Sequence, residues 1–115
     1  MEKIVEQGIL YDFYGELLTE HQRSIYEEVV LNDYSLSEVA QDQGISRQGV
    51  HDMIKRCNKI LAGYEDKLHL LQKFLKTKEM VARINIFAKE ILEQEQRAEI
   101  IDKLEKIENM SNAIL

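Results

Sequence analysis

Apolar residues recur along the first third of the chain at the spacings of amphipathic helices. Intervals of three to five residues place such side chains on one side of a helix, which buries them together. The pattern predicts a helix over residues 2–14 and a second over residues 19–32, which Thr19 and Gln22 would begin as a capping box. The predicted inward positions are Ile4, Val5, Ile9, Leu10, Phe13 and Tyr14 in the first helix, then Ile25, Tyr26, Val29 and Val30 in the second.

Two further helices are predicted, close together, at residues 36–43 and 47–62. Ser35 and Ser46 stand at their N-cap positions, and Ser35 forms a capping box with Glu38. Gly44 supplies the positive φ that ends the first helix. The apolar residues expected to pack the two helices together are Val39, Ala40 and Ile45 on one side, and Val50, Ile54 and Cys57 on the other. This arrangement is typical of a helix-turn-helix.

The last third has a different pattern. Its apolar residues follow heptad-like steps of three and four, interrupted near residues 93–97, with charges of both signs between them. Gly63 either ends the preceding helix or only weakens it, since an apolar stripe continues through Leu61, Tyr64, Leu68, Leu71 and Leu75. We therefore expect an all-α protein with a helix-turn-helix domain at residues 1–70 and a C-terminal helical arm at 71–115. The arm either folds back on the domain or is a dimerisation element of a homodimer.

Composition agrees with an almost entirely helical protein, because the chain has no proline and five scattered glycines. No apolar run approaches the roughly 20 residues that span a bilayer. The N-terminus has no apolar region typical of a secretory signal. The single cysteine, Cys57, excludes an internal disulfide and suits a reducing compartment. We expect a cytoplasmic protein without membrane insertion, with Cys57 as a buried thiol.

The charge distribution bears on nucleic-acid binding. The net charge is −6, whereas proteins that bind nucleic acid strongly are usually basic. Residues 46–59 are the exception, because Arg47, Lys55, Arg56 and Lys59 are opposed there by Asp52 alone. The most basic short segment thus falls on the second helix of the motif. One copy of so acidic a chain is expected to bind a duplex weakly.

Several blocks of sequence, at residues 12–19, 33–40, 45–56 and 64–68, resemble the YlxM family of small bacterial helix-turn-helix proteins. The similarity runs from about residue 8 to residue 70. The family's motif is similar to region 4 of sigma-70-type factors, and its members are associated with the signal recognition particle (SRP) pathway through neighbouring genes. The resemblance implies a regulatory role in that pathway. The chain departs from the family at Gly49, commonly Ala, and at His51, commonly Tyr.

Candidate contacts lie on the second helix of the motif. Helix-turn-helix proteins contact bases with the N-terminal part of this helix, where Arg47, Gln48 and His51 stand. Arg pairs with guanine and Gln with adenine. Lys55 and Arg56, further along, suit phosphates. Asp52 is expected to be structural and to pair with Arg56 or Arg47.

Other chemistry finds little support in the sequence. The aromatic residues Tyr11, Phe13, Tyr14, Tyr26 and Tyr34 fit a core better than a surface for stacking RNA bases. His21, His51 and His69 lack metal-ligand spacing, so no metal site is expected. Phosphate-binding loops and catalytic motifs are absent, so we expect neither an enzyme nor a cofactor.

Two functions remain open. The first is a regulatory protein that binds DNA, with RNA as an alternative. The second is an adaptor that docks on SRP components without sequence-specific DNA binding, because a fold does not fix a function.

Overall fold

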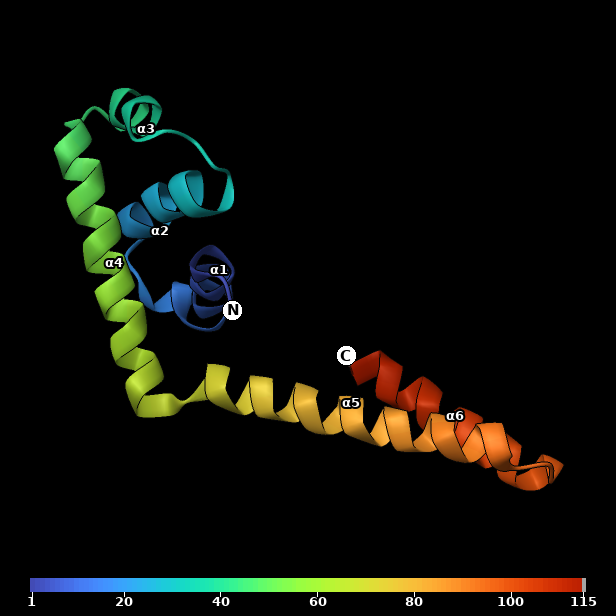
Figure 1. Ribbon diagram of the computed structural model, residues 1–115. Coiled ribbons are helices and arrows are strands. Elements are labelled where there is room, and N and C mark those ends of the chain that lie inside the picture. Colours follow the sequence, from blue (N-terminus) through green and yellow to red (C-terminus); the bar gives the residue numbers. More distant parts are fainter. Residues whose placement is uncertain (115) are drawn as a thin grey trace. The chain divides into compact units, whose positions relative to one another are not determined.

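The computed structural model describes residues 1–114, and these residues contain helices and no strand (Figure 1). This confirms the all-α expectation. The elements are α1 (Lys3–Tyr14), the 3₁₀ turn η1 (Gly15–Leu17), α2 (Glu20–Tyr26), the π-helical turn η2 (Glu27–Leu31), α3 (Leu36–Gln43), α4 (Arg47–Leu68), α5 (Leu70–Gln94) and α6 (Ala98–Ile114). The chain divides into two compact units, one of residues 1–71 and one that starts at Gln72. None of the described helices combines the length and apolar character needed to cross a membrane.

The second predicted helix is present, but it ends in an unusual turn. The capping box at its start is confirmed: the Gln22 amide donates to Thr19 Oγ1 at 3.2 Å, and the Thr19 amide donates to Gln22 Oε1 at 2.9 Å. After Tyr26 the backbone widens, since the Asn32 amide donates to the Glu27 carbonyl five residues earlier. Asp33, at φ 57°, then turns the chain toward α3.

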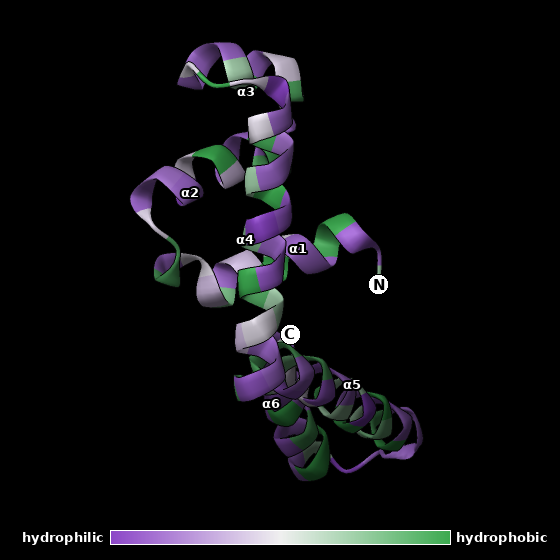
Figure 2. Ribbon diagram, turned by 90° about the vertical axis from the view of Figure 1, so that its left-hand side faces the viewer, coloured by the Kyte–Doolittle hydropathy of each residue, from purple (hydrophilic) through white to green (hydrophobic). Residues whose placement is uncertain are grey.

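The core of the first unit lies along one side of α4. Figure 2 shows apolar and polar residues alternating along this helix, as an amphipathic pattern requires. The larger of two clusters contains Leu10, Tyr14, Leu18, Tyr26, Val30, Cys57, Leu61 and Leu71. In α1 the buried face is narrower than predicted, because Ile4 and Val5 remain exposed.

The assignment of the aromatic residues to the core is confirmed for some of them and wrong for others. Tyr14 and Tyr26 are buried, and the Tyr11 ring stacks on that of Tyr26 with centroids 5.4 Å apart. Phe13 and Tyr34 are exposed instead. The hydroxyl of the buried Tyr26 donates to Asn58 Oδ1 at 2.6 Å, and that of the half-buried Tyr11 donates to Glu27.

Helix α4 continues through Gly63 and ends at Leu68, six residues beyond the predicted end at 62. His69 stops it by adopting the left-handed conformation, at φ 57°. The stripe predicted to run on to Leu75 is therefore broken, and Leu68 and Leu75 are exposed. Gly63 lowers the stability of the helix by only about 1 kcal/mol relative to alanine, and the packing of Leu61 and Tyr64 offsets this loss.

A polar cluster ties α1 to the junction that follows α4. The Tyr14 hydroxyl donates to Glu65 Oε1 at 2.7 Å and accepts from the Leu70 amide at 3.1 Å. Glu65 Oε1 also accepts from the Leu71 amide at 2.9 Å. These bonds satisfy the first amides of α5, which the interruption at His69 leaves without helical partners.

The second unit is an antiparallel pair formed by α5, from Gln72 onward, and α6. Its buried side chains within residues 72–114 are Val81, Ala88 and Ser111. The Ser111 hydroxyl donates to the Val81 carbonyl at 3.2 Å. Leu92 of α5 and Ile100, Ile101 and Leu104 of α6 are half-buried around these residues.

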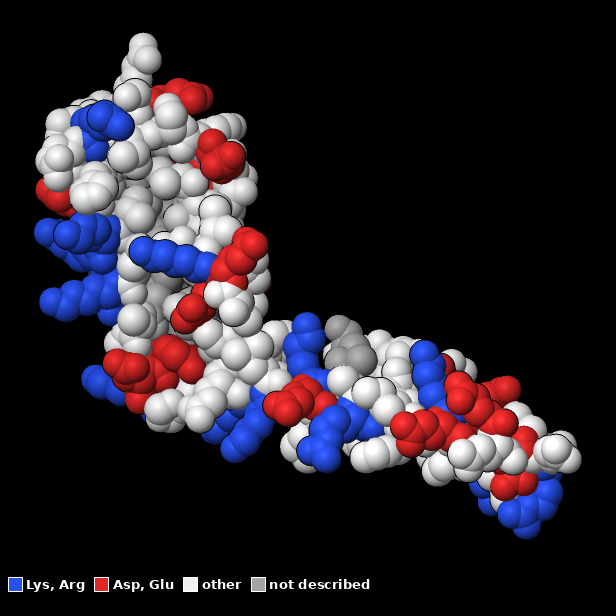
Figure 3. Space-filling model, in the orientation of Figure 1, with Lys and Arg blue, Asp and Glu red and all other residues white. Residues whose placement is uncertain are grey.

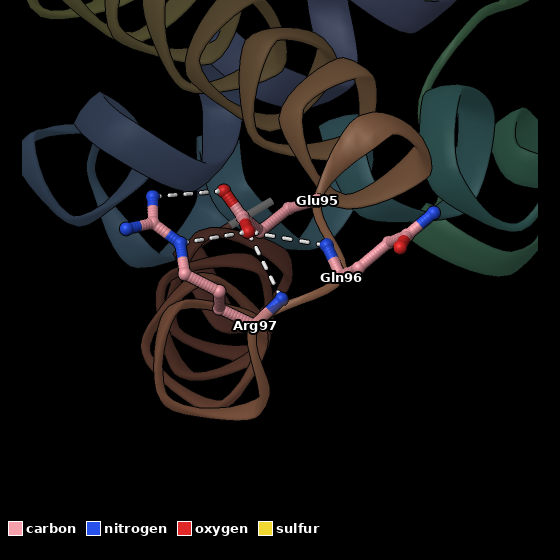
Figure 4. Close-up of polar contacts among 3 residues, drawn as sticks. All are labelled: Glu95, Gln96 and Arg97. Carbon is pink, nitrogen blue, oxygen red and sulfur yellow. Dashed lines mark hydrogen bonds and ion pairs between the residues drawn. The ribbon is translucent and has the colours of Figure 1, made fainter.

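The turn between α5 and α6 lies within the segment where the heptad pattern is interrupted. Figure 4 shows Glu95 at its centre, accepting from the backbone amides of Gln96 and Arg97 at 3.1 and 2.9 Å. The Arg97 guanidinium also donates to this carboxylate, at 3.1 Å from Nε. These bonds hold the pKa of Glu95 below its usual range.

Glu28 of η2 accepts a hydrogen bond from the end of α3, and the pKa of its carboxyl group is raised. Gln43 Nε2 donates to Glu28 Oε1 at 3.4 Å and to Ser24 Oγ at 3.1 Å. Burial, and after it the nearby Asp42 carboxyl, raise the pKa of Glu28 above its ordinary 4.5. Glu28 therefore holds a proton more readily in the folded chain than in the unfolded one.

Substituting Tyr14→Phe should lower the free energy of unfolding by about 1–3 kcal/mol, because it removes a buried hydroxyl that makes two hydrogen bonds. Urea denaturation followed by circular dichroism measures the change. The matched control is Tyr34→Phe at a half-exposed position, with an expected change within about 0.5 kcal/mol. Equal losses in the two variants would contradict the role given to the Tyr14 hydroxyl.

The raised pKa of Glu28 makes the stability of the fold depend on pH in a defined direction. Above pH 4.5 the unfolded chain releases this proton more readily than the folded chain, so stability falls as pH rises from there through the folded-state pKa. Glu28→Gln removes this titration and keeps an acceptor for Gln43. Its stability should fall less than that of the wild type between pH 4.5 and pH 7 in urea titrations. An unchanged pH slope would contradict the assignment.

Candidate nucleic-acid interface

The helix-turn-helix is built from local hydrogen bonds at the ends of α3 and α4. Ser35 Oγ accepts from the Glu38 amide at 3.1 Å, and Glu38 Oε1 accepts from the Ser35 amide at 3.4 Å. Gly44 ends α3 at φ 69°, in the left-handed conformation that glycine adopts without strain. Both predicted features are confirmed.

Helix α4 begins at a second serine cap. Ser46 Oγ accepts from the Gly49 amide at 2.9 Å. A Cβ atom at position 49 would lie 3.1 Å from this oxygen, closer than most such contacts. Gly49 therefore leaves room for the cap, although it lowers helix propensity. This is a structural reason for glycine at this position.

A compact cluster fixes α3 against α4. Its buried members are Ile25, Val39, Ala40 and Val50, with Leu36, Ile45, Met53 and Ile54 packed around them. Cys57 is buried as predicted, but it belongs to the larger cluster beside Tyr26 rather than to this one. Seven residues after Val50, it lies two helical turns further along α4, beyond the reach of the short α3.

Because this cluster buries one side of α4, the opposite side faces outward. All five candidate residues are exposed: Arg47, Gln48, His51, Lys55 and Arg56. The structure brings the first three together with Leu36 around an open hollow of about 390 Å³ at the start of α4. Lys55 and Arg56 follow one to two turns further along the helix.

Asp52 does not pair as expected. Gln48 Nε2 donates to Asp52 Oδ1 at 3.0 Å, and His51 Nδ1 lies 3.7 Å from the same oxygen. Within residues 1–114, Arg47, Lys55 and Arg56 form no ion pair. Gln48 lies four residues before Asp52 and Arg56 four residues after it, so helical spacing alone cannot choose between them. The cations are therefore left to interact with an external anion.

Two more cations extend this surface, and the sequence-based candidate set omits both. Lys59 is exposed four residues after Lys55 and so lies one turn further along the same side of α4. Lys3 of α1 lines a hollow of about 370 Å³ that Lys55 and Asn58 also line. Figure 3 shows Lys and Arg side chains projecting from the outward side of α4. The spacing of Lys59 from Lys55 could have identified it from the sequence. Lys3 comes close to Lys55 only through tertiary packing.

Metal chemistry has no counterpart in the part of the chain that the structure describes. There, no group of three or more His, Cys, Asp or Glu side chains is arranged to hold an ion.

The fold and the capped pair of helices define a helix-turn-helix protein. Comparison with known families gives a full-length match: the family described as "UPF0122: Putative helix-turn-helix protein, YlxM / p13 like" matches residues 1–114. The chain belongs to this family. The match includes the second unit, whereas the blocks recognised in the sequence end near residue 70.

Individual relatives agree with this assignment. The UPF0122 protein YlxM of Bacillus subtilis is 41% identical over 108 residues, which cover 94% of this chain and 98% of the relative. A UPF0122 protein of Geobacillus sp. is 42% identical over 109 residues, covering 94% and 99% of the two chains. The family description names a helix-turn-helix and no catalytic activity.

Substituting Ser46→Ala should destabilise the chain by about 1 kcal/mol, because it removes the side-chain acceptor at the start of α4. Thermal unfolding measures the effect. Ser37→Ala is the control, since Ser37 is exposed and lies inside α3 rather than at a cap. If the two alanine variants unfold at the same temperature, the Ser46 cap does not hold α4 as described.

Proposed function

We propose that this protein is a regulatory nucleic-acid-binding protein that inserts the first half of α4 into the major groove of duplex DNA. The observation that carries the proposal is the row of exposed cations without ion pairs on a helix that a capped helix-turn-helix holds in place. In proteins with this motif the second helix lies in the groove, and its N-terminal residues contact base edges.

The residues divide by position. Arg47, Gln48 and His51, which stand together at the start of α4, are assigned to bases, where Arg and Gln pair with guanine and adenine. Gln48 has to exchange its bond to Asp52 for one to a base. That bond is exposed, so the exchange costs little. Lys55 and Arg56 are assigned to phosphates, with Lys59 as a further contact.

A single copy has few cations for this task. Residues 1–71 contain seven Lys and Arg against thirteen Asp and Glu, and four of the seven lie between residues 47 and 59. Three phosphate contacts, from Lys55, Arg56 and Lys59, give a slope of about −2.7 in log affinity against log salt. We therefore expect binding that is weak but strongly salt-dependent.

The acidic charge favours a second candidate function. Outside α4, the first unit would repel nucleic acid and suits a basic protein or ribonucleoprotein surface instead. The family resemblance links such a surface to the SRP pathway. In this alternative the chain is an adaptor, and α4 contributes no base contacts.

The experiment is fluorescence anisotropy with a mixed-sequence duplex of about two helical turns, between about 50 and 200 mM salt. Wild-type affinity should fall roughly 40-fold across that range if one copy neutralises three phosphates. Lys55→Ala should reduce the slope by about 0.9 and weaken binding at every salt concentration. Lys67→Ala is the matched control, because Lys67 is exposed on the last turn of α4, far from the proposed interface.

The two functions predict different results in this assay. Groove insertion predicts that Lys55→Ala changes the slope and Lys67→Ala does not. It also predicts that Arg47→Ala, tested on duplexes of different sequence, weakens the preference among them. Equal effects of Lys55→Ala and Lys67→Ala would contradict groove insertion. The adaptor would be favoured if the chain, crosslinked and purified from its host, brought SRP RNA or the SRP GTPases without enrichment of DNA.

A further inference from the structure

The two helices of the second unit are joined by polar contacts along one flank. Asn85 Nδ2 donates to Asn112 Oδ1 at 2.8 Å, and Lys89 Nζ lies 3.9 Å from Glu108 Oε1. Each pair has one member on α5 and one on α6. These contacts therefore identify which side of α5 adjoins which side of α6.

The opposite flank is apolar on both helices. At 100° per residue, four exposed residues of α5 and three of α6 lie about 150° around their helices from these polar residues. They are Met80, Ile84, Phe87 and Ile91 on α5, and Ile107, Met110 and Ile114 on α6. Since the polar flanks adjoin each other, the two apolar stripes lie on the same side of the pair and form one continuous surface, here called the apolar flank.

The apolar flank has the spacing of a helix-packing surface. Its residues are four, three and four apart on α5, and three and four apart on α6, which are the steps of a coiled-coil or four-helix-bundle seam. Met80, Ile84 and Phe87 with Arg83 also line a hollow of about 190 Å³. Such a hollow accepts a side chain from a facing helix.

The second unit has a small core of its own, in which Leu92, Ile100, Ile101 and Leu104 are half-buried. Its fully buried side chains within residues 72–114 are Val81, Ala88 and Ser111, which remove less apolar area from water than the seven exposed residues of the apolar flank would if they were covered. Stable helical units bury their apolar stripes against another layer. The apolar flank thus requires a covering layer.

Charge indicates what that layer is. Residues 72–115 contain eight Lys and Arg and eight Asp and Glu, so this unit is neutral, whereas residues 1–71 carry the whole net charge of −6. Two first units repel each other, but two neutral second units do not. Exposed charges of both signs along α5 and α6 can also find opposite partners on an identical surface, as a twofold interface requires.

We propose that the apolar flank binds the same flank of a second copy of this chain, so that two helix pairs form a four-helix bundle. The dimer brings two helix-turn-helix units into one particle and doubles the cations available to a duplex. This proposal does not depend on nucleic-acid binding, and it is tested without nucleic acid.

The test is sedimentation equilibrium of the full chain at micromolar concentrations. The wild type should have twice the chain mass of 13.5 kDa. Ile84→Glu and, on the other helix, Ile107→Glu should each yield monomers. The matched control is Ile86→Glu, because Ile86 is 54% exposed against 49% for Ile84 but lies on a different side of α5. This control should remain dimeric.

A milder pair of variants keeps the test decisive if the charged ones unfold. Phe87→Ala should raise the dissociation constant at least tenfold, as for a buried aromatic at an interface, and Ile86→Ala should change it less than twofold. A monomeric wild type would overturn the proposal and assign the flank to residues 1–71 or to another protein. A dimer that persists in Ile84→Glu and Ile107→Glu would also overturn it.

Discussion

The structure of the first unit depends on one constraint, which is that the 22 residues of α4 bury one stripe and expose the other. Val50, Cys57 and Leu61 are completely buried against the preceding helices, and this fixes the rotation of α4 about its axis. A shift of one residue turns the helix by 100° and would bury Lys55 or Arg56 without a partner, at a cost of several kcal/mol. The burial that stabilises the fold therefore also aims the cations outward.

Much of this arrangement could be predicted because it rests on local chemistry. The caps at Thr19, Ser35 and Ser46, and the left-handed Gly44, depend on residues within five positions of one another. The end of α4 could not be predicted in this way. His69 adopts a positive φ at a junction held by Tyr14 and Glu65, which are 51 residues apart, and no local pattern reports such a bond.

The candidate site shows the same division between local and long-range information. Exposure of Arg47, Gln48, His51, Lys55 and Arg56 follows from the apolar stripe, which the sequence displays. The pairing of Asp52 with Gln48 depends on a choice between positions four residues before and four residues after it, which helical spacing leaves equal. Lys3 joins Lys55 only because α1 packs on α4, and that contact is a property of the tertiary fold.

The central claim is that the outward side of the first half of α4 contacts nucleic acid. The most direct measurement is a titration of the isotope-labelled chain with duplex DNA, followed by amide chemical shifts in NMR spectra. The account predicts that the largest changes fall on residues 46–59, with α6 unaffected. Changes centred on α1 to α3 or on α6, with α4 unperturbed, would contradict this claim.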